Sequence, residues 1–143
     1  MSIEFKTPTI DDYDRVIELW DESDIPCKPK GRDRKENIEE ELEEQPEYWI
    51  GAYEDEEMVG IIFGTDDGRK GWINRLAVAE DYRGQGIGKK LVEKLEHVFE
   101  EKGFKIWAAL IEPDNPEGMK FFEHLGFEDK NIKYYSKRES DKV

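Results

Sequence analysis

The stretch from Tyr48 to Gly103 constrains the fold most, because its hydrophobic pattern changes from strand-like to helical within one short region. Residues 48–78 form three apolar segments separated by turn-forming residues at 54–57 and 65–71. Connections this short join antiparallel strands. Apolar side chains then recur at helical spacing up to Gly103, namely Ile87, Leu91, Val92, Leu95, Val98 and Phe99. The stretch therefore predicts a three-stranded antiparallel sheet followed by a long helix.

The apolar segment 105–111, KIWAALI, follows that helix and predicts a further strand, buried on both faces. Because a helix separates it from the strand at 72–78, the two should be parallel neighbours joined by a right-handed crossover. The predicted order is β-α-α-β-β-β-α-β-α-β, an α/β protein with a mixed sheet. A chain of 143 residues has the usual size of one domain, so we expect residues 1–143 to form one. The shorter predicted elements are a strand at 3–6, helices around 13–20, 38–42 and 119–125, and a final strand at 132–137.

The charge balance excludes several classes of partner. The sequence has 22 Lys and Arg against 36 Asp and Glu, a net charge of −14, which repels nucleic acids and anionic lipids. No segment approaches the ~20 apolar residues of a membrane span, and the first residues lack an apolar run of signal length. Cys27 is the single cysteine and so forms no internal disulfide, as is usual in reducing compartments. We expect a cytoplasmic protein with no nucleic-acid or membrane partner and no metal site.

The turn before the long helix, DYRGQGIGKK at 81–90, carries the most informative chemistry. Its glycines let main-chain amides approach a ligand closely, and the following helix points free N–H groups and its positive dipole end at the same spot. Residues 82–92 include no acidic side chain, whereas Arg83, Lys89 and Lys90 are basic. The pattern predicts an anion site, most naturally for phosphate. A glycine-rich turn before a solvated basic helix start is the alternative.

The spacing of these glycines argues against two common phosphate-binding motifs. A P-loop needs glycine five residues before Gly88 and Ser or Thr after the lysine, but Arg83 and Lys90 stand there. A dinucleotide-binding fold places G-x-G-x-x-G in an initial βαβ unit, whereas here G-x-G-x-G follows three antiparallel strands. Neither a nucleoside triphosphate nor a dinucleotide is favoured.

The same residues resemble the acetyl-coenzyme A signature of the GCN5-related N-acetyltransferases, [Gln/Arg]-x-x-Gly-x-[Gly/Ala], which Arg83 to Gly88 match completely. The segment LAVAEDYRG before the turn and residues 115–127 after it are also similar to the family, and the resemblance is specific over about 72–127. Within the family, IELWDESDIP and PDN look most like the YpeA-type branch. The resemblance implies a mostly antiparallel mixed sheet whose central parallel strand pair is splayed around acetyl-coenzyme A (acetyl-CoA), with helices on its faces.

The resemblance also implies which residues hold acetyl-CoA. The pyrophosphate would rest on the main-chain amides of 84–89, and the pantetheine arm would bond the main chain of Leu76 and Val78, where backbone donors polarise the acetyl carbonyl. Asn115 would contact the cofactor side, although it is also an N-cap candidate before Pro116. The implied cofactor-binding residues are Leu76, Ala77, Val78, Arg83, Gly84, Gln85, Gly86, Ile87, Gly88, Lys89, Asn115 and Phe122.

Phe122 stands where many family members have a tyrosine thought to protonate the departing thiolate. We expect Phe122 to pack the last helix without donating a proton, with Tyr134 or Tyr135 as at most a substitute donor. Losing a general acid costs ~10²- to 10⁴-fold, but a thiol with pKa near ~8.5 is a tolerable leaving anion near neutrality. A general base could come from Glu54 or Glu112, and the sequence does not choose between them.

The expected function is transfer of an acetyl group from acetyl-CoA to a primary amine of a small molecule. A non-catalytic acyl-CoA sensor is one alternative. Protein N-terminal alanine acetylation is another, weakened because Leu110 stands where ribosomal-protein N-terminal acetyltransferases look like they use a glutamate. Dimer formation is a family tendency.

Two charge arguments about the acceptor disagree. The net charge favours a polyamine or a basic peptide. The loop at 23–34, which borders the acceptor site in this family, favours an amine bearing a carboxylate or phosphate, and being local it should dominate over a field screened within ~8 Å. Arg75 either faces the acceptor pocket or pairs with a surface carboxylate. The charged residues of the loop are Lys28, Lys30, Arg32 and Arg34 against Asp24 and Asp33.

Overall fold

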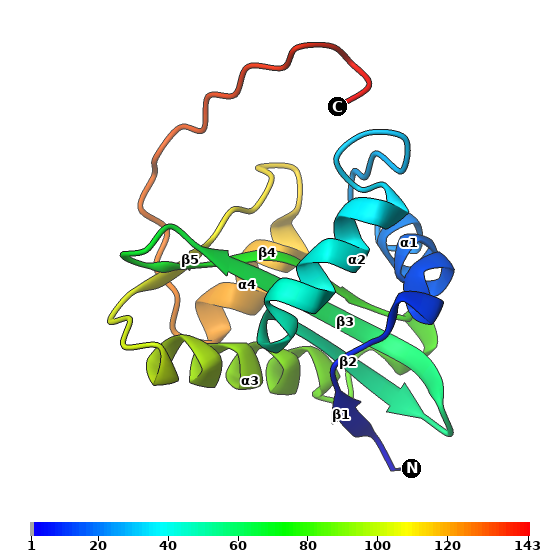
Figure 1. Cartoon of the computed structure of the whole chain (residues 1–143). Coiled ribbons are helices and arrows are strands. Elements are labelled where there is room, and N and C mark those ends of the chain that lie inside the picture. Colours follow the sequence, from blue (N-terminus) through cyan, green and yellow to red (C-terminus); the bar gives the residue numbers. More distant parts are fainter. Residues whose placement is uncertain (1) are drawn as a thin grey trace.

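The computed structural model describes residues 2–143 and centres on a five-stranded sheet with strand order β1-β2-β3-β4-β5 (Figure 1). The strands are β1 (Glu4–Lys6), β2 (Trp49–Glu54), β3 (Glu57–Asp66), β4 (Gly71–Val78) and β5 (Trp107–Ala109). The helices are α1 (Tyr13–Glu22), α2 (Lys35–Glu44), α3 (Ile87–Glu101) and α4 (Pro116–His124). Short 3-10 turns, η1 (Ile10–Asp12), η2 (Pro46–Tyr48) and η3 (Glu80–Tyr82), connect some of them.

The pairing of the central strands confirms the sequence prediction. β2, β3 and β4 are successive antiparallel neighbours. The β2–β3 hairpin turns at Asp55 and Glu56, whose φ angles of 49° and 68° suit a tight two-residue turn. β4 and β5 run parallel, with Gly71 opposite Trp107 and Ile73 opposite Ala109. A mixed, mostly antiparallel sheet results.

Helices cover both faces of the sheet (Figure 1). On one face, Trp20 of α1 packs against Phe63 of β3, with ring centroids 5.9 Å apart. On the other, Leu91 and Leu95 of α3 lie against two glycines of β3, and both leucines are fully buried. The apolar residues predicted to line the buried side of the long helix do face the core. The helical spacing of these residues was therefore enough to predict which side of α3 is buried.

Two predictions about the C-terminal part are wrong. The strand expected at 105–111 shrinks to Trp107–Ala109 and is only half-buried, because β5 is the last strand of the sheet and Ile106 and Leu110 on either side are exposed. The final strand expected at 132–137 is not formed, and Ile132 there is 83% exposed. A strand needs a neighbour to satisfy its main-chain groups, and this segment instead arcs away from α4 toward the loop between α1 and α2 (Figure 1).

Across residues 2–143, the search for a helix that could span a membrane finds none of sufficient length and apolarity.

Candidate functional site

The edge of β4 opens where its pairing with β5 stops. Phe63 of β3 lies opposite Arg75 but Gly64 lies opposite Ile73, so Asn74 is an extra residue that bulges from β4. β5 pairs with β4 only at residues 71–73. Beyond the bulge, residues 74–78 have β3 on one side and no strand on the other within the described chain. Leu76, Ala77 and Val78 therefore lie on the part of β4 where the parallel strands have parted.

The turn before α3 presents main-chain amides to solvent. Gly84 and Gly86 have φ angles of 77° and 84°, the left-handed conformation that glycine adopts without strain. Gly86 caps α3 without any side-chain hydrogen bond, and the first turn of α3 has no acidic residue. Lys89 and Lys90 are exposed beside it. Free N–H groups, the helix dipole and two lysines together suit an anionic group, so an anion site here stays a prediction consistent with this geometry.

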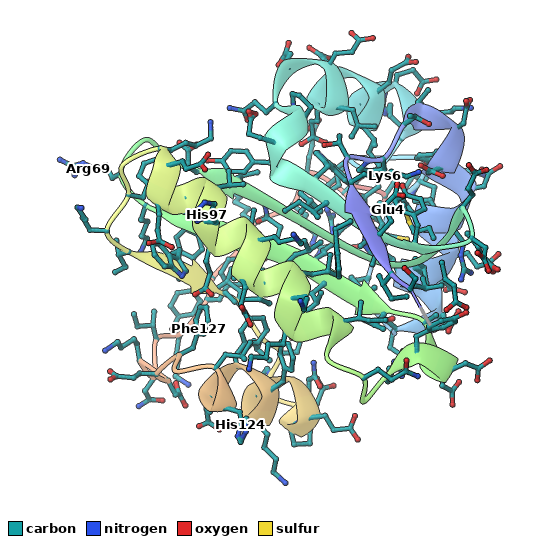
Figure 2. All side chains as sticks on the ribbon, turned by 90° about the horizontal axis from the view of Figure 1, so that it is seen from below. Glu4, Lys6, Arg69, His97, His124 and Phe127 are labelled. Carbon is teal, nitrogen blue, oxygen red and sulfur yellow. The ribbon has the colours of Figure 1, made fainter. Side chains whose placement is uncertain are left out.

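Helix α4 packs beside the start of α3 and brings the third predicted segment into place (Figure 2). A Cβ added at Gly88 would lie 3.3 Å from Cζ of Phe121 and 3.8 Å from Cγ2 of Val78. Gly88 is thus where the end of β4, the start of α3 and α4 meet, and a larger residue would push them apart. The structure brings together three of the predicted segments: residues 76–78, 83–89 and 115–122.

Asn115 is the N-cap of α4. Its Oδ1 accepts a hydrogen bond of 3.0 Å from the main-chain N–H of Gly118, which confirms the capping interpretation. A Cβ at Gly118 would lie 2.5 Å from Nδ2 of Asn115, which explains the small residue at that position. The cap uses the oxygen of the carboxamide and leaves its Nδ2 donor for other partners.

Arg83 has internal partners in addition to any role at the turn. Its Nε donates to the main-chain carbonyl of Val78 at 2.9 Å, and its Nη2 donates to Oγ of Ser23 at 3.3 Å. The guanidinium thus bridges the end of β4 and the end of α1. This positioning contact was not predicted, because nothing in the sequence connects position 83 with position 23.

Phe122 packs as expected. It is 9% exposed and meets Phe121 and Phe127 edge-to-face, with ring centroids 5.1 and 5.2 Å away. Tyr134 and Tyr135 lie in the segment after α4 with side chains 71% and 87% exposed, and the structure does not pack them with the other site residues.

The two carboxylates considered as general bases differ in their surroundings. Glu54 accepts a hydrogen bond of 2.7 Å from the hydroxyl of Tyr82, while Glu112 is exposed in the loop after β5.

The surroundings of Cys27 do not favour a nucleophile. Burial is the largest cause that raises the pKa of its thiol, followed by the nearby charge of Asp33. A raised pKa opposes formation of a nucleophilic thiolate.

Arg75 pairs with a carboxylate that the sequence did not single out. Asp33 is 6% exposed, and it accepts hydrogen bonds from Nη1 and Nη2 of Arg75 at 2.8 and 3.1 Å. The sequence left Arg75 facing a pocket or a surface carboxylate, but its partner is buried. Sequence spacing gives no hint of this pair, because the partners lie 42 residues apart.

Known proteins are similar to this chain in sequence and in fold. The sequence profile of the acetyltransferase (GNAT) family matches residues 13–127. "Acetyltransferase SG1711" of Sodalis glossinidius (strain morsitans) is 33% identical over 118 residues, which cover 82% of each chain.

Two solved structures show the same fold. PaiA N-acetyltransferase from Thermoplasma acidophilum, in complex with coenzyme A, superimposes with a TM-score of 0.81 at 23% identity, covering 93% of this chain and 94% of the other. The aminoglycoside N-acetyltransferase AAC(6')-Iy in complex with CoA gives a TM-score of 0.73 at 18% identity, covering 96% and 95%.

Proposed function

This chain belongs to the acetyltransferase (GNAT) family, and we propose that it transfers the acetyl group of acetyl-CoA directly to the primary amine of a small molecule. The observation that carries the proposal is the open turn at Gly84–Gly86, whose free amides lie at the start of α3 beside the unpaired part of β4. A diphosphate and an extended amide-bearing arm are the chemistry that such a pair of features fits.

Two segments of the chain would hold different parts of acetyl-CoA. The main-chain amides of 84–89, helped by Lys89, would hold the diphosphate, and the main chain of 76–78 would hold the pantetheine amides. The thioester supplies an acetyl group activated for attack by an amine. Main-chain donors near Leu76 would polarise its carbonyl, and such preorganised donors are worth far more in a water-excluded site than in water.

Proton transfer is not assigned to Phe122, which has no hydroxyl. Thiol pKa values near ~8.5 make departure of a thiolate tolerable near neutrality, so catalysis does not require a donor at this position. Tyr134 and Tyr135 remain the proposed substitutes, at most.

A small amine bearing a carboxylate or phosphate is the proposed acceptor. Because Asp33 is buried and paired with Arg75, the exposed charges of the loop at 23–34 are more basic than its sequence indicates. Lys30, Arg32 and Arg34 are exposed there, against Asp24 alone among the acidic residues. The aminoglycoside acetyltransferase described above resembles this chain only distantly, so its acceptor is not assigned to this protein.

A second candidate function is an acyl-CoA sensor that binds the donor without turnover, and the absence of a hydroxyl at Phe122 favours it. Acetylation of protein N-terminal alanines is the weaker alternative, because the residue directly after β5 is the exposed Leu110 and not a carboxylate.

The experiment measures release of free coenzyme A from acetyl-CoA across polyamines, amino acids, phosphorylated amines and short peptides, on wild type and Phe122→Tyr in parallel. We expect wild type to turn over an anionic small amine. A preference for spermidine over every amino acid derivative would overturn the proposed acceptor class. Silence from wild type with turnover by Phe122→Tyr would make the sensor the correct function.

A further inference from the structure

Two arginines tie the loop at 23–34 to strand β4. At its start, Arg83 links Ser23 to the carbonyl of Val78. At its end, Arg75 of β4 holds Asp33. Between these anchors, the turn at 28–34 carries the basic residues proposed to face the acceptor. The contacts at Asp33 help to fix its position, together with a hydrogen bond of 2.9 Å from Nζ of Lys28 to the carbonyl of Asp141.

The Arg75–Asp33 pair is fixed in direction as well as distance. Nη1 of Arg75 donates to Oδ1 of Asp33, and Nη2 donates to Oδ2. The guanidinium also lies over the ring of Trp20, 4.4 Å from its centroid, and Trp20 is fully buried. A bidentate, stacked arginine is a geometry that lysine does not reproduce.

Asp33 also organises the turn itself. Its Oδ2 accepts from the main-chain N–H of Lys28 at 2.7 Å, and its own N–H donates to the carbonyl of Lys28 at 3.0 Å. Gly31 N–H donates to the same carbonyl at 2.8 Å. The carboxylate therefore closes the turn and anchors it to β4 at the same time. Among residues 2–143, Asp33 is the one charged residue that is buried.

The anchor lies on the opposite face of the sheet from the donor turn. Arg75 points to the α1 face, where it covers Trp20 and Phe63. Val78 approaches Gly88 on the α3 face. Leu76, where the acetyl carbonyl is proposed to sit, is the residue next to Arg75. A change at Arg75 can thus move the acceptor side without touching the turn at 84–89.

We infer that the Arg75–Asp33 ion pair is a positioning device that holds the basic turn at 28–34 beside β4 and sets the affinity for the acceptor amine. The inference rests on the proposed function, because it assumes that this turn borders the acceptor. Neither residue takes part in bond making. Their effect is on where Lys30 and Arg32 stand when an anionic amine approaches.

Limited trypsin digestion tests the anchoring without any acceptor. The bonds after Lys30 and Arg32 lie in the turn, and Arg75→Lys and Arg75→Gln leave the sequence of the cleaved segment intact. We expect cleavage at these bonds to accelerate ~10-fold in both variants, because a loosened turn opens more often. Arg69→Lys, in the exposed β3–β4 hairpin, is the matched control and should digest like wild type (Figure 2). Unchanged cleavage in the Arg75 variants would overturn the inference.

Kinetics tests the consequence for the acceptor. The probes are O-phosphoethanolamine, glycine amide and spermidine, and the comparison uses O-phosphoethanolamine where wild type acetylates it, because the inference concerns an anionic amine. In Arg75→Lys we expect the acceptor KM to rise ~10-fold while the acetyl-CoA KM stays within ~2-fold, since only the acceptor side loses its anchor. Equal rises in both constants would overturn the inference, because they would indicate general loosening.

The double variant Asp33→Asn/Arg75→Gln separates positioning from stability. Removing one partner leaves an unpaired buried charge, whereas removing both does not, so the double variant should recover the Tm lost by Asp33→Asn alone. We expect its acceptor KM to stay raised, because the anchor is still missing. Recovery of both Tm and KM would contradict a positioning role.

The two proposals fail differently. If wild type acetylates none of the three probes or the wider panel, the proposed function fails, while the digestion result still decides whether the pair anchors the turn. If wild type acetylates a probe and the Arg75 variants keep its KM, the inference fails and the proposed function stands.

Discussion

At the scale of single residues, glycines at either end of α3 share a conformation but not a role. Gly86 and Gly103 have φ angles of 84° and 90°, and a Cβ added at either would have nothing within 4 Å. The steric cost of alanine should therefore be the same local backbone strain at both sites. Only Gly86 lies in the turn proposed to hold the diphosphate, so the pair separates strain from binding.

We predict that Gly86→Ala and Gly103→Ala each lose about 1–2 kcal/mol of unfolding free energy, the usual cost of a left-handed non-glycine residue. Coenzyme A affinity should fall at least ~10-fold in Gly86→Ala, because main-chain amides of the turn would be displaced, and should stay at the wild-type value in Gly103→Ala. Urea unfolding and calorimetric titration with coenzyme A measure the two quantities. Equal affinities in both variants would remove the turn from the binding site.

At the scale of elements, the start of α4 combines a structural contact with a proposed ligand contact in one side chain. Asn115 caps the helix through Oδ1, and Pro116 follows at the first helical position. Serine also caps helices through an oxygen but lacks the amide nitrogen. Alanine has neither the capping oxygen nor the nitrogen donor. These two substitutions thus separate the functions of the carboxamide.

We predict that Asn115→Ala lowers the unfolding free energy by about 1 kcal/mol, and that Asn115→Ser leaves it nearly unchanged. Both variants should bind coenzyme A ~3- to 10-fold more weakly, because both lose the Nδ2 donor, worth about one hydrogen bond. The measurements are thermal unfolding and fluorescence titration. Wild-type affinity in Asn115→Ser would make the cap the whole role of this residue.

Elements also show why some sequence predictions succeeded and others did not. The predictions of α3 and of the β2–β3–β4 meander used side-chain periodicity, tight turns and a terminal glycine. All of these signals act between residues close in sequence. β5 and the expected strand at 132–137 depend instead on a neighbouring strand. An isolated β-prone segment such as IKYYSK carries no information on whether an edge is available to it.

At the scale of the whole molecule, two buried tyrosines link distant parts of the fold. Tyr48 donates to Asp66, and Tyr53 donates to Asp12 at 2.9 Å, and each ring is nearly inaccessible to solvent. Burial first, and then the hydrogen bond to a carboxylate, raises the pKa of both hydroxyls well above the ordinary tyrosine value. The folded state therefore retains both protons at pH values where the unfolded chain releases them.

We predict that these hydroxyls give stability no pH dependence below about pH 10, and that stability falls above it, because there the unfolded state binds fewer protons than the folded state. The slope should be ~1.4 kcal/mol per pH unit for each tyrosine. Urea unfolding between about pH 9 and 11.5 measures it. Tyr48→Phe/Tyr53→Phe should flatten the slope, whereas the control Tyr134→Phe/Tyr135→Phe, which removes two exposed hydroxyls, should not. An equal slope in both double variants would contradict the prediction.

The sequence by itself determined the class of fold, the meander, the long helix and the glycine-rich turn that we propose binds an anion, because local hydrogen bonding, side-chain periodicity and glycine conformations encode them. Only the tertiary structure decided that Arg75 meets a buried Asp33, that Arg83 reaches Ser23, that β5 stays at an edge and that residues 132–137 form no strand. These outcomes depend on which distant groups the closed chain brings together. Many carboxylates could have paired with Arg75, and packing against Trp20 and the turn at Lys28 selected one.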